Sequence, residues 1–193
     1  MIDFLKGRLA AKHPNRIVID VNGVGYNLNI SLHTYSSISD DEKVMLYTHL
    51  AIRDDAHLLY GFYTEEERDL FLKLISVSGI GASTAQLILS SMNPTEVRQA
   101  IVSENVNAIK AIKGIGQKTA QRLIIDLKDK VSGVAETYEI GSNQGNTAGE
   151  EALSALIALG FDRRKSEKMI STLVQSGEYQ SVEGLIKTAL KNL

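Results

Sequence analysis

Two copies of one short motif, 35 residues apart, contain the residues best suited to bind an anion. Gly-Ile-Gly occupies 79–81 and again 114–116, and each copy runs into a helical pattern with a Thr-Ala-Gln core. With no side chain in front of them, the backbone N–H groups at the start of each helix are open to a phosphate or a carboxylate. Two such cradles at a fixed separation suit regularly repeated phosphates, so the motifs predict binding to a nucleic-acid backbone.

A tight turn between two apolar helices is the simpler interpretation of any single Gly-x-Gly. The duplication favours binding, because the polar positions that we expect to be exposed repeat along with the apolar ones. The residues predicted to contact DNA belong to the two hairpins and the helix starts after them: Gly79, Gly81, Ser83, Thr84, Gly114, Gly116, Lys118, Thr119 and Arg122. Contacts to phosphates set position without reading bases, so we expect recognition to follow the shape of the DNA.

Composition excludes several other functions. The 193 residues carry a net charge of −2, which does not fit a protein that coats nucleic acid indiscriminately, and residues 64–130, with 9 basic and 8 acidic side chains, form the only net positive segment. There is no cysteine, and the 4 histidines lack metal-like spacing, so we expect neither a metal nor a cofactor. The second motif fails the Walker A spacing. Neither a signal peptide nor a membrane span is apparent, which predicts a cytoplasmic protein.

The elements that must position these motifs follow from hydrophobic periodicity. Residues 1–63 alternate apolar and polar side chains in short runs, which predicts an OB-type β-barrel. Its five strands are expected at 4–11, 16–21, 26–30, 44–52 and 57–62. Residues 64–131 change to helical periodicity around the two motifs, which predicts a tandem helix-hairpin-helix DNA-binding domain opened by a capping box from Thr64 to Glu67.

The rest of the chain predicts a small module on a tether. Residues 132–148 are rich in Gly, Ser, Asn, Thr and Gln and read as a flexible linker. Residues 149–193 hold three helical patterns, expected at 152–159, 163–174 and 182–190, and resemble three-helix modules of the ubiquitin-associated type, which usually bind protein. The core of this module is expected to contain the apolar residues Leu156, Leu159, Ile170, Leu173 and Leu185.

These features together resemble the RuvA family of Holliday-junction-binding proteins of bacterial recombination, over nearly the whole chain. The resemblance rests on Gly-Val-Gly-Tyr at 23–26, Thr-His-Leu-Ala-Ile-Arg-Asp-Asp-Ala-His-Leu-Leu-Tyr-Gly-Phe at 48–62, both Gly-Ile-Gly motifs and the C-terminal module. It implies a non-catalytic DNA-binding subunit, a homotetramer that holds a four-way junction open for branch migration by a hexameric ATPase motor, RuvB. It also implies roles in recombination, repair of DNA damage and the SOS response, and a RuvC-type resolvase as a further partner. Whether one tetramer or an octamer of two covers the DNA stays open.

The resemblance also implies roles for individual residues. Asp54 and Asp55 would form an acidic pin at the junction centre, although an acidic pair at a hairpin tip is by itself only a good turn former. The C-terminal module would contact the motor through an apolar surface, for which the candidates are Leu159, Phe161, Ile170 and Val174. Ser83 stands where a lysine is common in the family, so we expect the second hairpin, with Lys118, to dominate affinity.

Two other classes of function remain open on the sequence alone. Some helix-hairpin-helix glycosylases use the motif's lysine as a nucleophile with a distant aspartate, which would make Lys118 catalytic, and the corresponding region here holds Glu136. A general single-strand binder built on the barrel would need stacking aromatics, for which the candidates are Tyr26, Tyr47 and Tyr60.

Overall fold

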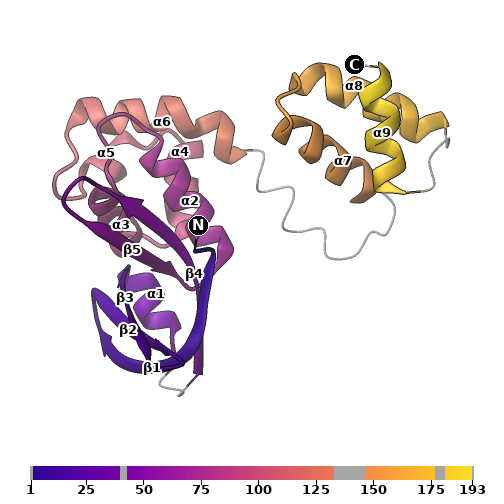
Figure 1. Ribbon diagram of the computed structural model, residues 1–193. Helices are drawn as coiled ribbons and strands as arrows, with labels where there is room; N and C mark the ends of the chain where they lie inside the picture. Colours follow the sequence, from indigo (N-terminus) through magenta and orange to yellow (C-terminus); the bar gives the residue numbers. More distant parts are fainter. Residues whose placement is uncertain (1, 40–42, 133–146, 177–180, 193) are drawn as a thin grey trace. The chain divides into compact units, whose positions relative to one another are not determined.

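The computed structural model describes residues 2–39, 43–132, 147–176 and 181–192. The chain separates into two compact units, Met1–Thr137 and Tyr138–Leu193 (Figure 1). Within the described residues, no helix combines the length and the apolar character needed to cross a membrane.

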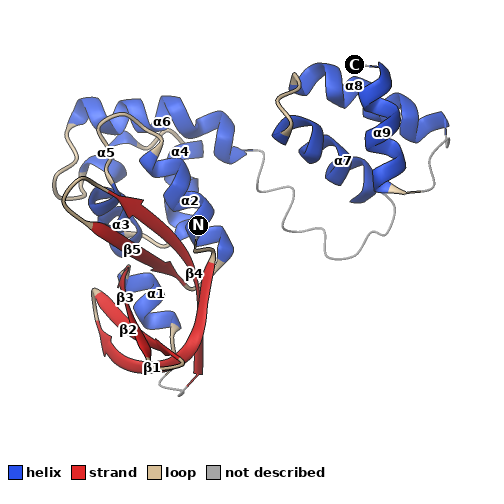
Figure 2. Ribbon diagram, in the orientation of Figure 1, coloured by secondary structure: helices blue, strands red, loops and turns tan. Residues whose placement is uncertain are grey.

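The first unit begins with a closed five-stranded barrel, which confirms the OB-like prediction (Figure 2). The strands follow the chain as β1 (Phe4–His13), β2 (Arg16–Val21), β3 (Val24–Ile30), β4 (Lys43–Ile52) and β5 (His57–Phe62). They close in the order β1-β2-β3-β5-β4, in which β3 and β5 pair in parallel and all other neighbours are antiparallel. Alternate side chains, such as Ile17, Ile19, Leu28 and Leu46, fill the barrel's interior.

Two strands, β1 and β3, are each two residues longer than the periodicity predicts. Asn22 (φ 52°) and Gly23 (φ 89°) form a tight turn with two successive positive φ angles, so β3 starts at Val24 instead of at 26. That geometry matches the twist of a β-hairpin and favours Asn-Gly. Strand β1 extends to His13. Its register with β2 shifts between Leu9 and Ala11, where a bulge lets the strand bend around the barrel.

One helix was not predicted. The connection after β3, for which the sequence predicted no helix or strand, contains α1 (Leu32–Ser37). Its start is capped by Ser31, whose side-chain oxygen accepts a hydrogen bond from the backbone N–H of Thr34 at 2.9 Å. A helix of 6 residues is too short to show a helical period, so only the capping serine marks it.

Five helices follow the barrel and confirm the predicted helix-hairpin-helix region. They are α2 (Glu65–Ile75), α3 (Ala82–Ser91), α4 (Pro94–Val102), α5 (Val106–Lys110) and α6 (Gln117–Ser132). Asn93 and Glu96 form a complete capping box at the start of α4. At α2 only half of the predicted box is present: Thr64 accepts from the backbone N–H of Glu67, but the Glu67 carboxylate turns toward α1.

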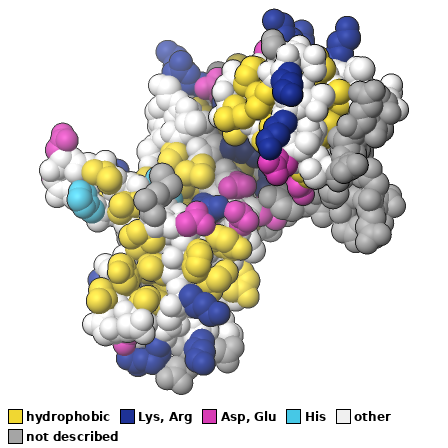
Figure 3. Space-filling view, turned by 45° about the vertical axis from the view of Figure 1, so that its right-hand side comes forward, with side chains coloured by type: hydrophobic (Ala, Val, Ile, Leu, Met, Phe, Trp, Pro, Cys, Tyr) yellow, Lys and Arg dark blue, Asp and Glu magenta, His cyan; other side chains and the backbone are white. Residues whose placement is uncertain are grey.

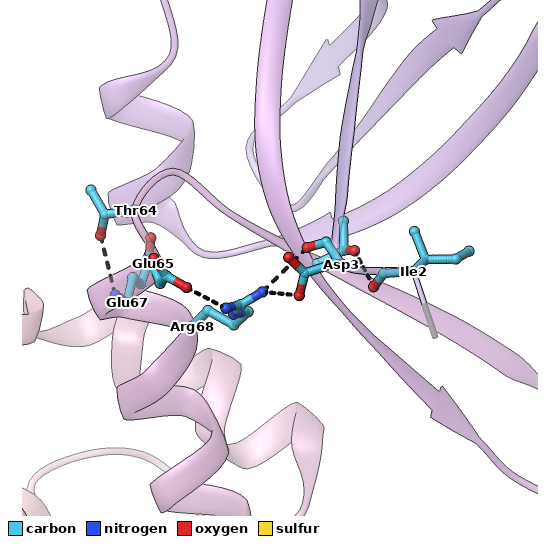
Figure 4. A network of polar contacts seen from close by, with 7 residues as sticks. Ile2, Asp3, Thr64, Glu65, Glu67 and Arg68 are labelled. Atoms are coloured by element: carbon cyan, nitrogen blue, oxygen red, sulfur yellow. Dashed lines mark hydrogen bonds and ion pairs between the residues drawn. The ribbon is translucent and has the colours of Figure 1, made fainter. Parts of the chain in front are cut away.

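The barrel and these helices share one packed unit. Tyr60 and Phe62 of β5 lie in the helical core, with ring centroids 5.2 and 4.8 Å from that of Phe71 in α2. Arg68 of α2 donates hydrogen bonds to the Asp3 carboxylate at 2.6 Å and to Glu65 at 2.7 Å (Figure 4). The change of periodicity after residue 63 therefore marks a change of secondary structure inside a single compact unit.

The second unit is a three-helix module made of α7 (Thr147–Ala158), α8 (Arg163–Ser176) and α9 (Val182–Asn192). Leu156, Ile170 and Leu185 are buried in its core as expected, and Leu173 packs against them. The predicted tether lies almost wholly outside the described residues, as does Glu136; the exceptions are Ser132, which ends α6, and residues 147 and 148, which begin α7.

Leu159 was wrongly expected in this core, since 61% of its surface is exposed. Gly160 (φ 93°), the residue after Leu159, caps the end of α7. Its N–H donates to Ile157 O, and the N–H of Phe161 donates to Leu156 O. This pair of bonds is a Schellman motif, which turns the chain away from the helix axis. Leu159 therefore leaves the buried stripe that the period-3.6 pattern assigns to it.

Candidate nucleic-acid interface

The two Gly-Ile-Gly motifs form hairpins with the same backbone geometry. Each is closed by three backbone hydrogen bonds between residues that match at an offset of 35. In the first hairpin they are Val77 N to Leu74 O (3.1 Å), Ile80 N to Val77 O (3.0 Å) and Ala85 N to Gly81 O (2.9 Å). In the second they are Ile112 N to Ile109 O (3.2 Å), Ile115 N to Ile112 O (3.1 Å) and Ala120 N to Gly116 O (2.9 Å). The repeat in sequence is thus a repeat in structure.

The glycines of each motif have two different roles. Gly79 (φ 93°) and Gly114 (φ 86°) take the left-handed conformation that L side chains rarely adopt. Gly81 and Gly116 do not, and a Cβ added to either would meet no described atom within 4 Å. The fold itself therefore does not require glycine at these two positions. No side chain bonds to the N-cap of α3, so the missing side chains leave the helix start open to a ligand.

Charge differs strongly between the two hairpins. Lys113, Lys118 and Arg122 are exposed around the second hairpin. The matching positions in the first are neutral: Ser78, Ser83 and Leu87. Arg122 lies 4.0 Å from the carboxylate of Asp126 on the next turn, and more than half of its side chain stays exposed. The second cradle therefore combines open N–H groups with full positive charges, whereas the first offers only neutral donors such as Ser83 and Thr84.

The repeated glutamine is exposed in only one copy, contrary to the sequence-based expectation. Gln121 lies on the surface of α6. Gln86 is part-buried and donates from Nε2 to the backbone oxygen of Ile30 at 2.6 Å. The first hairpin is thereby fixed to the barrel, while the equivalent side chain of the second is exposed on α6.

Asp54 and Asp55 belong to neither Gly-Ile-Gly hairpin; they lie in the turn between β4 and β5. The turn is closed by a hydrogen bond from Arg53 N to Ala56 O at 2.9 Å, and all three charged residues are exposed. In Figure 3 this β-hairpin projects from the barrel with acidic side chains at its end. The carboxylates are therefore accessible to a large ligand and belong to the same compact unit as the two cradles.

Sequence reasoning missed the part played by Glu67, which it assigned to a helix start. Its side chain is fully buried, at 0% exposure, and accepts hydrogen bonds from Ser31 Oγ (2.5 Å), Thr34 Oγ1 (2.6 Å) and Tyr63 N (3.3 Å). A buried carboxylate of this kind needs such donors to offset its lost hydration. Glu67 thus ties α2 to α1, and no pattern in the sequence brings residues 31 and 67 together.

The aromatic residues considered for base stacking are poorly placed for it. Tyr60 is 2% exposed and packs on Phe71, so its ring is not available to a nucleotide. Tyr47 is half-buried beneath Arg68, whose guanidinium carbon lies 5.3 Å from the ring centre. Tyr26 is half-buried against the barrel core. Single-strand binding through stacking on these rings is therefore disfavoured.

Of the residues proposed for the motor contact, two lie on the surface of the second unit. Leu159 and Phe161 are exposed on either side of Gly160, and Ile157 is exposed nearby in α7. Ile170 is 5% exposed and belongs to the core, so its side chain is not on the surface of this unit. Val174 is half-buried against the same core.

Comparisons with known proteins cover the whole chain. Residues 1–61 match the RuvA N terminal domain, residues 71–129 the SAM-like helix-hairpin-helix tandem, and residues 147–193 the RuvA C-terminal domain. Similar proteins include those of Christiangramia forsetii (52% identical), Flavobacterium psychrophilum (50%) and Bacteroides thetaiotaomicron (46%), each aligned over 100% of both chains. All three are named Holliday junction branch migration complex subunit RuvA. With this identity over its full length and with RuvA family models matched at both its N-terminal and its C-terminal parts, the chain belongs to the RuvA family.

Proposed function

We propose that this chain binds four-way DNA junctions as a homotetramer, holds them open, and recruits and stimulates the RuvB ATPase for branch migration in recombination and repair. The observation that carries the proposal is the pair of hairpins with matching backbone hydrogen bonds, in which the fold itself does not require glycine at Gly81 and Gly116. The names of its relatives support the junction as the DNA and the branch migration complex as the assembly. Because its DNA lies there, we expect the protein to act in the cytoplasm.

In this proposal the two cradles hold phosphates of a duplex arm through the predicted contact residues of α3, α6 and the preceding turns. Neutral N–H and hydroxyl donors act at the first cradle, and Lys118 and Arg122 add charge at the second. No base is read, so affinity should depend on DNA shape and salt. The direct test compares binding to a four-way junction and to a linear duplex of the same length at matched salt. Equal affinities would refute the proposal.

The acidic turn supplies the preference for the junction. A carboxylate about 6 Å from a phosphate is repelled by roughly 1–3 kcal/mol for effective dielectrics between those of water and a protein surface. In a tetramer, the Asp54 and Asp55 carboxylates of all four chains would stand close to the crossover and keep its strands apart. The double variant Asp54→Asn/Asp55→Asn should bind DNA at least as tightly as the wild type but prefer junctions less. An undiminished preference would exclude the acidic pin.

The second unit contacts the motor through exposed apolar side chains at the end of α7, namely Leu159 and Phe161, whereas Val174 is half-buried and lies near Gly149 at the start of α7. We leave Ile170 out of this surface because it is buried. A chain that ends before residue 147 should keep junction binding and lose stimulation of RuvB ATPase. The variant Leu159→Asp should do the same in the full-length chain, while Arg164→Asp, at an exposed position of α8, serves as its control. Stimulation that survives the truncation would contradict this assignment.

A glycosylase activity at Lys118 is the rival that the same motif allows. Incubation with abasic or damaged duplex DNA, followed by borohydride, would trap a covalent adduct on Lys118 if the lysine were a nucleophile. We propose that no adduct forms and that the chain is a non-catalytic subunit. Mass measurement of the complex distinguishes one tetramer from two on the junction, and addition of a RuvC-type resolvase tests whether it joins the same complex.

A further inference from the structure

Gln86 and Gln121 occupy the same position of two hairpins whose backbones match, yet they make different contacts. Gln121 is exposed, whereas Gln86 reaches out of its own motif to the backbone oxygen of Ile30 at 2.6 Å. The difference does not come from the motif itself, because the hydrogen bonds that close the two hairpins are equivalent. It comes from the barrel, which adjoins α3.

A second tie lies one turn further along α3. Ser90 Oγ accepts a hydrogen bond from the backbone N–H of Leu32 at 3.1 Å and donates one to the backbone oxygen of Gln86 at 2.8 Å. Ile30 is the last residue of β3, and Leu32 is the first residue of α1. The two side chains therefore fix α3, the helix that follows the first cradle, to one point on the barrel.

That point is connected to the acidic turn by regular structure. Ile30 pairs with Gly61 in the parallel ladder between β3 and β5, and β5 runs back from Gly61 to the turn that holds Asp54 and Asp55. At about 3.3 Å per residue, β5 spans roughly 13 Å from Gly61 back to His57, where the turn begins. A continuous path of helix, side-chain tie and strand thus relates the position of the first cradle to that of the carboxylates.

We infer that Gln86 is a positioning residue for junction selectivity, which sets the spacing between the first phosphate cradle and the acidic turn. The inference rests on the proposed function. A linear duplex needs only the cradles, so its binding tolerates a change in this spacing. A four-way junction must satisfy the cradles and the acidic turn at once, so it does not. Loss of the Gln86 tie should lower affinity for the junction more than affinity for the duplex.

The test compares Gln86→Met, which keeps the volume and removes the donor, with Gln121→Met as the matched control in the equivalent exposed position. The readout is the ratio of dissociation constants for duplex and junction at one salt concentration. We expect the ratio to fall about fivefold in Gln86→Met, as the loss of one net hydrogen bond allows, and to change less than about twofold in Gln121→Met. A merely structural role would lower the melting temperature and leave the ratio intact.

A double-mutant cycle identifies the route of the effect. In the Asp54→Asn/Asp55→Asn background, Gln86→Met should cause no further fall in the ratio, because there is no acidic pin left to position. Ser90→Ala, which removes the second tie, should act like Gln86→Met and decides the test if the latter does not fold. An unchanged ratio, an equal fall in Gln121→Met, or a full additional fall in the neutralised background would overturn the inference. A wild-type chain with no junction preference would instead refute the proposed function.

Discussion

Replacing Lys118 by alanine should flatten the salt dependence of junction binding, and replacing Ser83 should not. Lys118 is exposed in the first turn of α6 and makes no ion pair within the described part of the chain, so its charge is available to a phosphate. Each phosphate that a cation neutralises contributes about 0.9 to the slope of log affinity against log salt. With four chains in the proposed tetramer, Lys118→Ala should lower the magnitude of the slope by about 3.6.

This difference is large enough for a simple titration. Between 50 and 200 mM salt, a change of about 3.6 in slope means that the affinity of the variant falls roughly 150-fold less than that of the wild type. Fluorescence anisotropy with a labelled four-way junction would measure both curves. Ser83→Ala removes a neutral donor from the first cradle, so it should weaken binding by a similar factor at every salt concentration.

Lys187→Ala is the control for the loss of a positive charge elsewhere, since Lys187 lies in α9 and pairs with Glu183 at 2.6 Å. Its slope should match that of the wild type. If Lys118→Ala and Ser83→Ala gave the same slope, the charge difference between the hairpins would have no role in binding. If Ser83→Ala gave the flatter curve, the ranking of the two cradles would be reversed.

Three further predictions concern stability and the cradles. Glu67→Ala removes the buried acceptor between α1 and α2 and should destabilise the first unit by about 3 kcal/mol, which lowers its melting temperature by roughly 10 °C. A fall of only a degree or two would mean that water replaces the hydrogen bonds of Glu67. Gly116→Ala should melt at the same temperature as the wild type but bind DNA at least about fivefold more weakly. Gly114→Ala, at a positive φ, should instead lose about 1 kcal/mol of stability. Equal behaviour of the two variants would contradict the separate roles of these glycines. The hydrogen bond from Lys128 lowers the pKa of Glu104. This ion pair therefore contributes stability above the unfolded pKa of the glutamate, and the contribution is lost as the pH falls through the lower folded pKa. The difference in denaturation midpoint between the wild type and Lys128→Met should shrink below about pH 4.5 and stay constant above it.

Most of the fold could be predicted from the sequence because local periodicity decides most of its elements. Alternation located all five strands, and the capping residue Thr64 located the start of α2. Where the prediction failed, a short element or a turn overrode the pattern. The helix α1 is too short to be periodic, and the Schellman turn at Gly160 removed Leu159 from a stripe to which its spacing assigned it.

The candidate site was predicted less completely, because part of it depends on contacts between distant segments. The glycines of both cradles follow from the motif alone. The different environments of Gln86 and Gln121 do not, since both residues end the same Thr-Ala-Gln segment and only Gln86 bonds to the barrel, at Ile30 O. The same holds for Glu67, whose two side-chain donors, Ser31 and Thr34, lie more than 30 positions earlier in the chain.

Because Tyr60 and Phe62 pack among the helices, the barrel and the helical region depend on each other for folding. The last strand of the barrel supplies aromatic rings to the helical core, so neither half has a complete hydrophobic interior by itself. An isolated barrel would present those rings to water, and the isolated helices would be left with a void beside Phe71. Barrel and hairpins should therefore melt in a single cooperative transition, and the DNA-binding half is inseparable from the strand that carries the acidic turn.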